Sequence, residues 1–148
     1  MDPKDFVELA EQLVVARMAA AGQFRTAIGR AYYGTFNFGS QVLDQLGFPP
    51  TENAQGRNQT VRLFQQSGDP TLEAAAGLLS DLHTLRLKAD YQLKRTDVEK
   101  MKVAQAAVES ADSIFDDLDA FLGDPARRSA VTATLGPGYR SLTGKPNP

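Results

Sequence analysis

The stretch SDLHTLRLKADYQL, residues 80–93, decides the fold because its apolar and polar residues separate at helical spacing. At about 100° per residue, one face of such a helix is apolar. That apolar stripe comprises Leu78, Leu82, Leu85 and Ala89. A polar stripe borders it and comprises His83, Arg86 and Asp90. The pattern predicts an amphipathic helix that carries ionisable groups beside its buried face.

Arg86 needs a partner if it lies at the edge of a core. A half-buried arginine is tolerated only where a carboxylate, a partner chain or an anionic ligand meets it. Asp90, one turn later, is the nearest candidate, although Arg before Asp is the less favourable order for a solvated pair. Two hypotheses remain: a structural ion pair that ties two helices together, and an anion or phosphate site.

A second polar stripe lies in the helix predicted from about residue 23 to 46. Arg30 and Tyr33 share that stripe beside an apolar face. If this helix packs against the helix that contains residues 80–93, we expect Arg30 to face Asp90 while Tyr33 supplies a hydroxyl. The alternative is that Tyr33 is an ordinary amphipathic residue at the edge of the core. The small residues of this helix would let another helix approach closely, and they comprise Ala27, Ala31 and Gly34.

Five helices and no strand are predicted along the chain, so the fold class is all-α. The helices are expected at about residues 3–21, 23–46, 56–67, 70–93 and 96–122. Asp2 and Pro3 begin the first helix, and Gly22 ends it. Its core positions are Phe6, Leu9, Leu13, Ala16 and Ala20. Asp69 is expected to cap the fourth helix, and Thr96 with Glu99 has the spacing of a capping box for the fifth.

The fifth predicted helix is a packing helix, because its apolar residues alternate steps of three and four over its whole length. Its carboxylates on another face comprise Asp112, Asp116 and Asp119. Paired carboxylates can bind metal, but a solvated acidic face is the commoner arrangement. We therefore assign them no chemistry and expect neither a metal site nor a cofactor.

Length and composition limit the class of protein. A chain of 148 residues suits one domain with a sizeable core. It has no Cys and one His, which excludes a disulfide scaffold and a zinc site built from Cys and His. No apolar run approaches the roughly 20 residues of a membrane span, and MDPKDF lacks the features of a signal peptide. We expect a cytoplasmic protein without membrane contact.

The carboxyl-terminal 26 residues differ from the rest in charge and composition. Residues 123–148 carry four cations and Asp124, a net charge of +3, and the total of −2 leaves −5 for residues 1–122. Glycine and proline recur in this tail. We therefore expect a helical domain over 1–122 and a basic tail over 123–148 that is extended or partly disordered, apart from a short helix near 126–134.

Two motifs resemble those of the HEPN family, the higher eukaryotes and prokaryotes nucleotide-binding domains. FRTAIGRAYYGTF, residues 24–36, is similar to its pattern R-x-A-[IV]-S-R-A-Y-Y-A-x-F. LHTLRLKADYQL, residues 82–93, is similar to L-x-x-L-R-x-x-A-D-Y. The resemblance covers about residues 5–122. It implies an up-and-down helical bundle that forms homodimers, and RNA cleavage or nucleotide binding in toxin–antitoxin or defence systems, often beside a nucleotidyltransferase.

The resemblance also carries residues over. The matching positions comprise Arg30, Tyr32, Tyr33, Arg86, Asp90 and Tyr91. Gly29 stands where the family has Ser. Ribonuclease members carry a His a little over one turn after the Arg, where this chain has Tyr91, whose phenol has a reference pKa of about 10 and is a poor base at neutral pH. The only imidazole, His83, lies one turn before Arg86 on the same stripe.

Three functions follow as hypotheses. The first is a metal-independent endoribonuclease that uses Arg86 with His83 or Tyr91. The second is a binding module whose ligand-binding residues, Arg30, Tyr33, Arg86 and Asp90, hold RNA or a nucleotide. The third is a structural partner in a toxin–antitoxin or defence complex, in which the polar stripe is a salt-bridge network. We favour the second and third over the first.

Overall fold

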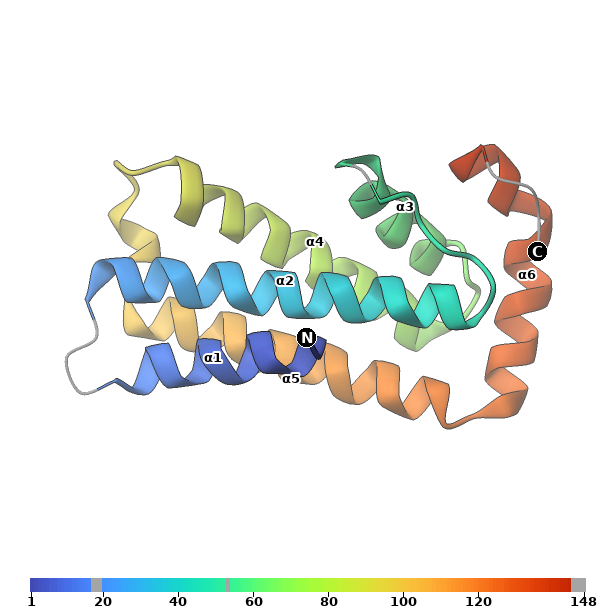
Figure 1. Ribbon diagram of the computed structural model, residues 1–148, viewed down its shortest axis with the longest axis horizontal. Coiled ribbons are helices and arrows are strands. Elements are labelled where there is room, and N and C mark those ends of the chain that lie inside the picture. The colour runs from blue at the N-terminus through green and yellow to red at the C-terminus, as the bar shows by residue number, and fades with distance from the viewer. Residues whose placement is uncertain (17–19, 53, 145–148) are drawn as a thin grey trace. The chain divides into compact units, whose positions relative to one another are not determined.

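The computed structural model describes residues 1–16, 20–52 and 54–144 (Figure 1). Within these residues the chain forms six α-helices and one 3₁₀ helix, and none of them lies in a strand. The α-helices are α1 (Pro3–Val15), α2 (Ala21–Gln45), α3 (Ala54–Gln65), α4 (Pro70–Tyr91), α5 (Met101–Leu122) and α6 (Pro125–Thr143). The 3₁₀ helix η1 spans Thr96–Val98. The predicted all-α fold class is confirmed, with one helix more than expected.

The chain divides into two compact units that each draw on separate segments. The first comprises Met1–Asn37 and Leu78–Phe115, and the second comprises Phe38–Gly77 and Asp116–Pro148. The long helices α2, α4 and α5 therefore contribute residues to both units. This division differs from the expected one at residue 122, which assumed that the tail stood apart from a single helical domain.

Neighbouring helices of the first unit run antiparallel. Gly34 on α2 meets Pro3 at the start of α1. Tyr32 on α2 contacts His83 on α4, with a distance of 5.2 Å between ring centroids. The helices α4 and α5 are joined by a short connection that contains η1, and they line a common groove. Figure 1 shows that α1 and α2 run in opposite directions, as do α4 and α5.

The start of α1 is as predicted, but its end and its buried face are not. Asp2 forms a capping box with Asp5, and Pro3 follows. The helix ends at Val15, and Gly22 lies inside α2 rather than after α1; positions 17–19 of the predicted helix are outside the described residues. The buried residues are Pro3, Val7, Ala10 and Val14. The predicted core position Leu9 is 41% exposed.

Helical spacing cannot decide between these two faces of α1, because both repeat at three and four residues. The packing of α2 decides it. A Cβ atom on Gly34 would lie 2.9 Å from the carbonyl oxygen of Pro3 and 2.9 Å from Cγ2 of Val7, so the two helices approach closely at this glycine. This contact brings the face that contains Val7 against α2 and leaves Leu9 outside.

The small-residue face of α2 therefore has its neighbour within the chain. Ala27 and Ala31 are fully buried, and Gly34 lies against α1. A close helix neighbour was predicted, and it is α1 rather than a second copy. Homodimerisation stays a prediction, and this face of α2 no longer supports it.

The predicted capping box at the start of the fifth helix is wrong. Thr96 begins η1, and α5 begins only at Met101, where the carbonyl oxygen of Lys100 accepts from Val103 and Ala104. The carboxylate of Glu99 accepts a hydrogen bond from the Arg25 side chain at 2.9 Å instead. The local pattern predicted that Glu99 caps the helix, but its carboxylate instead pairs with Arg25, which lies 74 residues away in the sequence.

The expectation that the tail is extended or disordered apart from a short helix near 126–134 is also wrong, because one helix, α6, covers residues 125–143 and continues well beyond that short segment. The carboxylate of Asp124 accepts from the backbone amides of Ala126 and Arg127, and Gly144, with φ of 69°, ends the helix. Pro137 removes a backbone donor inside the helix, which is normally destabilising. Packing must therefore compensate for this loss.

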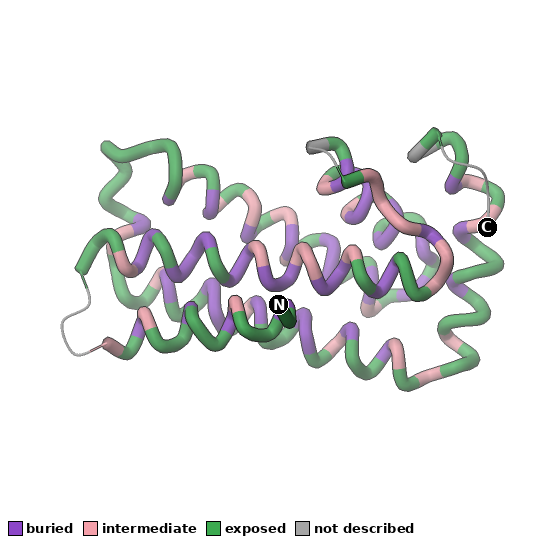
Figure 2. The backbone as a smooth tube through the Cα atoms, viewed as in Figure 1, coloured by how far each residue is buried: buried purple, intermediate pink, exposed green. Residues whose placement is uncertain are grey.

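Contacts of α6 within the second unit supply that packing. Val131, Leu135 and Tyr139 are buried at a spacing of four residues (Figure 2). The Tyr139 hydroxyl donates to the carbonyl of Pro49 at 2.7 Å. Two nitrogens of Arg127 donate to the two carboxylate oxygens of Asp69, each at 2.8 Å. Asp69 also caps α4, as predicted, by accepting from the amides of residues 71 and 72.

A search of the described helices found none that combines the length and apolarity needed to cross a bilayer.

Candidate anion-binding site

Arg86 is the buried centre of a polar cluster in the first unit. Its side chain extends from α4, and the residue is only 7% exposed. Its Nη2 atom donates to the hydroxyl oxygen of Tyr33 on α2 at 2.7 Å and to that of Tyr91 at the end of α4 at 3.2 Å. The guanidinium also lies over both rings, 5.2 Å from the centroid of Tyr33 and 5.0 Å from that of Tyr91. Both arrangements fix the cation in place.

Asp90 completes the cluster as an ion-pair partner of Arg86. The Nε atom of Arg86 lies 2.7 Å from Oδ2 of Asp90. The N–H group of Nε is nevertheless buried and makes no hydrogen bond among the described residues, because its direction does not align with the carboxylate. The Asp90 side chain is 32% exposed, so water also reaches it. The attraction is thus an i, i+4 ion pair without the alignment of a strong charged hydrogen bond.

The environment keeps Arg86 cationic. Burial acts to lower the pKa of its guanidinium, but hydrogen bonding to Tyr91 and the electrostatic effects of Tyr33 and Asp90 outweigh burial and raise that pKa above its ordinary value. Arg86 therefore has no role as a proton-accepting base near neutral pH. It is a fixed positive charge and a hydrogen-bond donor.

The two tyrosine hydroxyls are oriented by the same nitrogen. Each accepts a hydrogen bond from Nη2 of Arg86, so the proton of each hydroxyl is directed elsewhere. Tyr91 is 68% exposed, which puts one face of a phenol ring and its hydroxyl within reach of a ligand. The arrangement joins a cation with two O–H donors and an accessible aromatic surface.

Two of the predicted site residues lie outside this cluster. Arg30 is exposed, and its guanidinium lies 5.7 Å from the ring centroid of Phe6 on α1, not at Asp90. His83 is half-buried with its ring against Tyr32 at 5.2 Å. The structure thus brings together Arg86, Tyr33, Asp90 and Tyr91 and places Arg30 and His83 elsewhere.

Gly29 explains how Asp90 fits against α2. A Cβ atom at Gly29 would lie 3.6 Å from Oδ1 of Asp90, which is an ordinary van der Waals distance. The carboxylate therefore lies over Gly29 rather than beside Arg30. An added Cβ at this position would therefore not clash with the carboxylate.

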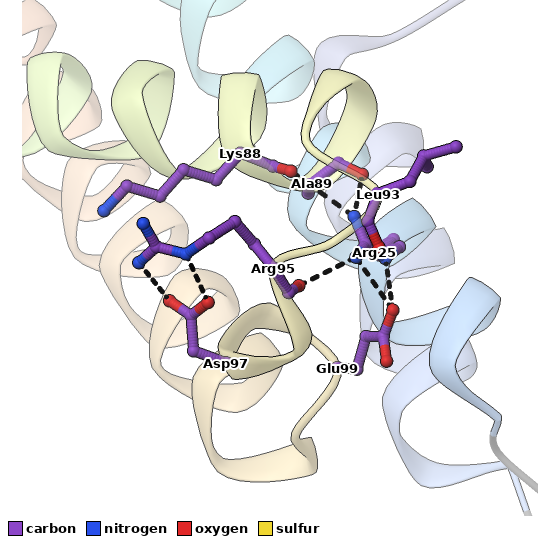
Figure 3. Close-up of polar contacts among 7 residues, drawn as sticks. All are labelled: Arg25, Lys88, Ala89, Leu93, Arg95, Asp97 and Glu99. Carbon is purple, nitrogen blue, oxygen red and sulfur yellow. Dashed lines mark hydrogen bonds and ion pairs between the residues drawn. The ribbon is translucent and has the colours of Figure 1, made fainter.

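Arg25 is a structural residue that the sequence analysis did not single out. It is 9% exposed and lies on α2 (Figure 3). Its guanidinium donates to Glu99 and to the backbone carbonyls of Lys88, Ala89, Leu93 and Arg95, at distances between 2.7 and 3.3 Å. The carbonyls of Lys88 and Ala89 lie in the last turn of α4, where a helix leaves acceptors unsatisfied, and those of Leu93 and Arg95 lie in the connection that follows. Arg25 therefore holds the segment that carries Tyr91.

A signal for Arg25 was present in its position within the first motif. It lies three residues before Ile28 and seven before Tyr32, on the face that is buried in α2. A charged residue on a buried face indicates a specific partner. Its partners are carbonyl groups of the backbone, which no pattern of side chains reveals.

Within the described part of the chain, no three His, Asp or Glu side chains lie close enough together to hold a metal ion. Comparison with protein-family models, with curated proteins and with solved structures found no match for this chain. The HEPN resemblance accordingly rests on the two sequence motifs alone.

Proposed function

We propose that this protein binds RNA or a nucleotide, and that Arg86, Tyr33 and Tyr91 hold the phosphate and base of that ligand. The observation that carries the proposal is that one buried, cationic nitrogen orients both phenol hydroxyls. Their protons remain available to donate to phosphate oxygens. The HEPN resemblance supports the same ligand class and suggests a homodimer in a toxin–antitoxin or defence system, with a nucleotidyltransferase or another toxin–antitoxin protein as partner.

Tyr91 suits a base of single-stranded RNA or of a nucleotide. Its ring is largely exposed and is backed by the Arg86 guanidinium at 5.0 Å. Stacking on an exposed aromatic ring is a common way to hold an unpaired base, worth about 1–3 kcal/mol per base. Because stacking is tolerant of base identity, this site would select for an accessible base and a phosphate rather than for a sequence.

Asp90 opposes an anion in this cluster. Its carboxylate neutralises part of the Arg86 charge, so the phosphate must be held mainly by the phenol hydroxyls and by the guanidinium face turned away from Asp90. The electrostatic attraction between cationic side chains and phosphate groups weakens as the salt concentration rises. We therefore expect moderate, salt-sensitive affinity and a gain in affinity when Asp90 is replaced by Asn.

A binding assay with a fluorescein-labelled single-stranded RNA and with ATP, in EDTA, tests this function. Tyr91→Ala removes both stacking and a donor and should weaken binding about tenfold or more, whereas Tyr91→Phe keeps the ring and should weaken it less. Arg95→Ala is the matched control, because Arg95 is exposed and its side chain pairs with Asp97 outside the cluster. Equal affinities for Tyr91→Ala and the wild type would refute the proposal.

The same cluster bears on the alternative of a metal-independent endoribonuclease. Of the two candidate partners of Arg86, Tyr91 contacts it, whereas His83 contacts Tyr32. A ribonuclease would therefore depend on Arg86 and Tyr91. RNA cleavage in EDTA that survives His83→Ala and disappears in Tyr91→Phe would establish that activity over simple binding.

The structural alternative is favoured by a different observation. Arg86 links α2 to α4 through Tyr33 and pairs with Asp90 on its own helix. Such a network can serve the bundle alone. Stability and binding measured on the same Arg86 variants separate the two roles.

A further inference from the structure

An apolar groove runs between α4 and α5 within the first unit. Its volume is about 490 Å³. Its floor is formed by aliphatic side chains from both helices, namely Leu78, Leu82, Leu85, Val103, Ala106 and Ala107. The two alanines take little space, which leaves the groove open between the leucines. Nothing in the proposed RNA or nucleotide site uses these residues.

The groove carries charges of opposite sign towards its two ends. Lys88 lies near the end of α4 and Lys102 near the start of α5, and both line the groove. Because the two helices are antiparallel neighbours, these lysines lie at the same end. Asp81 and Ser110 line the groove farther along, towards Leu78. The groove thus has two cations at one end and a carboxylate towards the other.

The two ammonium groups form no ion pair within the described part of the chain. The nearby carboxylates have other partners. Asp97 accepts from Arg95 at 2.8 and 3.0 Å, and this hydrogen bonding, with smaller electrostatic effects of Arg95 and Lys88, lowers the pKa of Asp97 to about 2. Glu99 accepts from Arg25. Lys88 and Lys102 are therefore available to an anion at the mouth of an apolar channel.

We propose that this groove binds an anionic amphiphile, a free carboxylate with an unbranched acyl chain. Its carboxylate lies between Lys88 and Lys102, and its chain lies on Leu85, Leu82 and Leu78. The reverse orientation would bring the carboxylate towards Asp81 and leave the lysines facing hydrocarbon. The charges at the two ends therefore set the direction of the ligand.

The dimensions of the groove set the chain length. Ten residues of α4 separate Leu78 from Lys88, which corresponds to about 15 Å at 1.5 Å per residue. An extended chain of about twelve carbons has this length, given C–C bonds of about 1.5 Å. The volume is in the usual range of small-ligand sites, about 300–1,000 Å³. A helix of the same length occupies roughly 1,200 Å³ and exceeds the groove.

Titration calorimetry of the full chain with laurate, below its micelle concentration, tests the proposal. We expect one laurate per chain and a rise in melting temperature, because a ligand that binds the native state stabilises it. Octanoate should bind at least tenfold more weakly because it covers less of the floor. Dodecanol, which has the same chain without a charge, should also bind at least tenfold more weakly.

Two double variants locate the carboxylate. Lys88→Ala with Lys102→Ala should reduce laurate affinity tenfold or more while dodecanol binding is unchanged. Lys94→Ala with Lys100→Ala is the matched control, because it removes the same charge from the same region but not from the groove, and it should leave laurate affinity within twofold. Tyr91→Ala should not alter laurate binding, which separates this groove from the proposed RNA or nucleotide site.

Several outcomes would overturn the proposal. Equal affinity for laurate and dodecanol, or equal loss in the two double variants, would remove the role of the lysine pair. A fall in melting temperature would identify laurate as a detergent. Absence of laurate binding together with a dimer that Leu85→Glu dissociates would identify a second copy of the chain as the occupant of the groove.

Discussion

The hydroxyl oxygen of Tyr33 on α2 lies 2.7 Å from Nη2 of Arg86 on α4, and this contact joins side chains of the two sequence motifs. The motifs are about 50 residues apart along the chain. Tyr33 accepts from the guanidinium and so keeps its own proton for another acceptor. The contact links α2 to α4 and also forms part of the proposed phosphate site.

Replacing Arg86 distinguishes these two roles. Arg86→Ala removes hydrogen bonds to two hydroxyls, each worth about 0.5–1.5 kcal/mol, and it strands Asp90. Because Asp90 is about one-third exposed, water can solvate it, and we expect a loss of only about 1–3 kcal/mol in unfolding free energy. RNA or ATP binding should be abolished in the folded variant. Urea unfolding and the binding assay on one preparation measure both effects.

Arg86→Lys sharpens the comparison, because lysine keeps the charge but lacks the planar fork that reaches both hydroxyls. If the cluster is a binding site, Arg86→Lys should bind RNA or ATP much more weakly than the wild type while its free energy of unfolding stays nearly the same. If binding in both variants falls only in proportion to the unfolded fraction, the cluster is a scaffold and the binding function is excluded.

Arg25→Met should loosen the connection between α4 and α5. Four backbone carbonyls and Glu99 lose the hydrogen bonds that Arg25 donates, and breaking a buried charged network of this kind costs about 3–5 kcal/mol when one partner is removed. Hydrogen exchange should accelerate in residues 88–100 before it does in α1. Arg95→Ala is the control, since its carbonyl oxygen remains available to Arg25. Uniform acceleration across the first unit would contradict a local role.

Much of the helical order was predictable because it depends on local signals. Asp2 with Pro3 and Asp69 with Pro70 mark helix starts through side chains that satisfy nearby amides. The second half of α6 was missed because Gly136, Pro137 and Gly138 indicate a turn, whereas the stability of the helix comes from burial of Tyr139 and from the pairing of Arg127 with Asp69. Those contacts span 58 or more residues of sequence.

The candidate site was predictable in part for the same reason. Arg86 and Asp90 are one turn apart on one helix, so their proximity follows from helical geometry. Which residue of α2 meets them depends on the rotation of that helix against its neighbours. Gly34 fixes this rotation through its contact with α1, which turns Tyr33 towards Arg86 and Arg30 towards Phe6.

The pair of Asp69 and Arg127 should make stability depend on pH in the acid range. Hydrogen bonding from Arg127 is the main cause that lowers the pKa of Asp69 below 3.8 in the folded state. A carboxyl whose folded pKa is depressed contributes stability above its unfolded pKa, and that stability is lost as pH falls through the folded value. Thermal melts should therefore show a steeper loss of stability below about pH 4 in the wild type than in Arg127→Met.

Asp69→Asn provides the complementary measurement. Asparagine still caps α4 but cannot ionise, so the variant should be less stable than the wild type at pH 7 and approach it below pH 3. A constant difference in stability between pH 7 and pH 3 would show that the ion pair contributes nothing beyond the cap.

Two glycine variants test whether α1 lies against α2 as described. Gly34→Ala would place a methyl group 2.9 Å from the Pro3 carbonyl and from Val7, and because the carbonyl belongs to backbone it cannot simply rotate away. We expect a loss of about 1–3 kcal/mol in unfolding free energy from overpacking, although alanine favours the helix.

Gly77→Ala is the matched control, since nothing lies within 4 Å of its added Cβ. It should stabilise the protein by about 0.5–1 kcal/mol through helix propensity. If Gly34→Ala is as stabilising as Gly77→Ala in urea unfolding, α1 does not occupy the small-residue face of α2, and that face becomes available to a second copy of the chain.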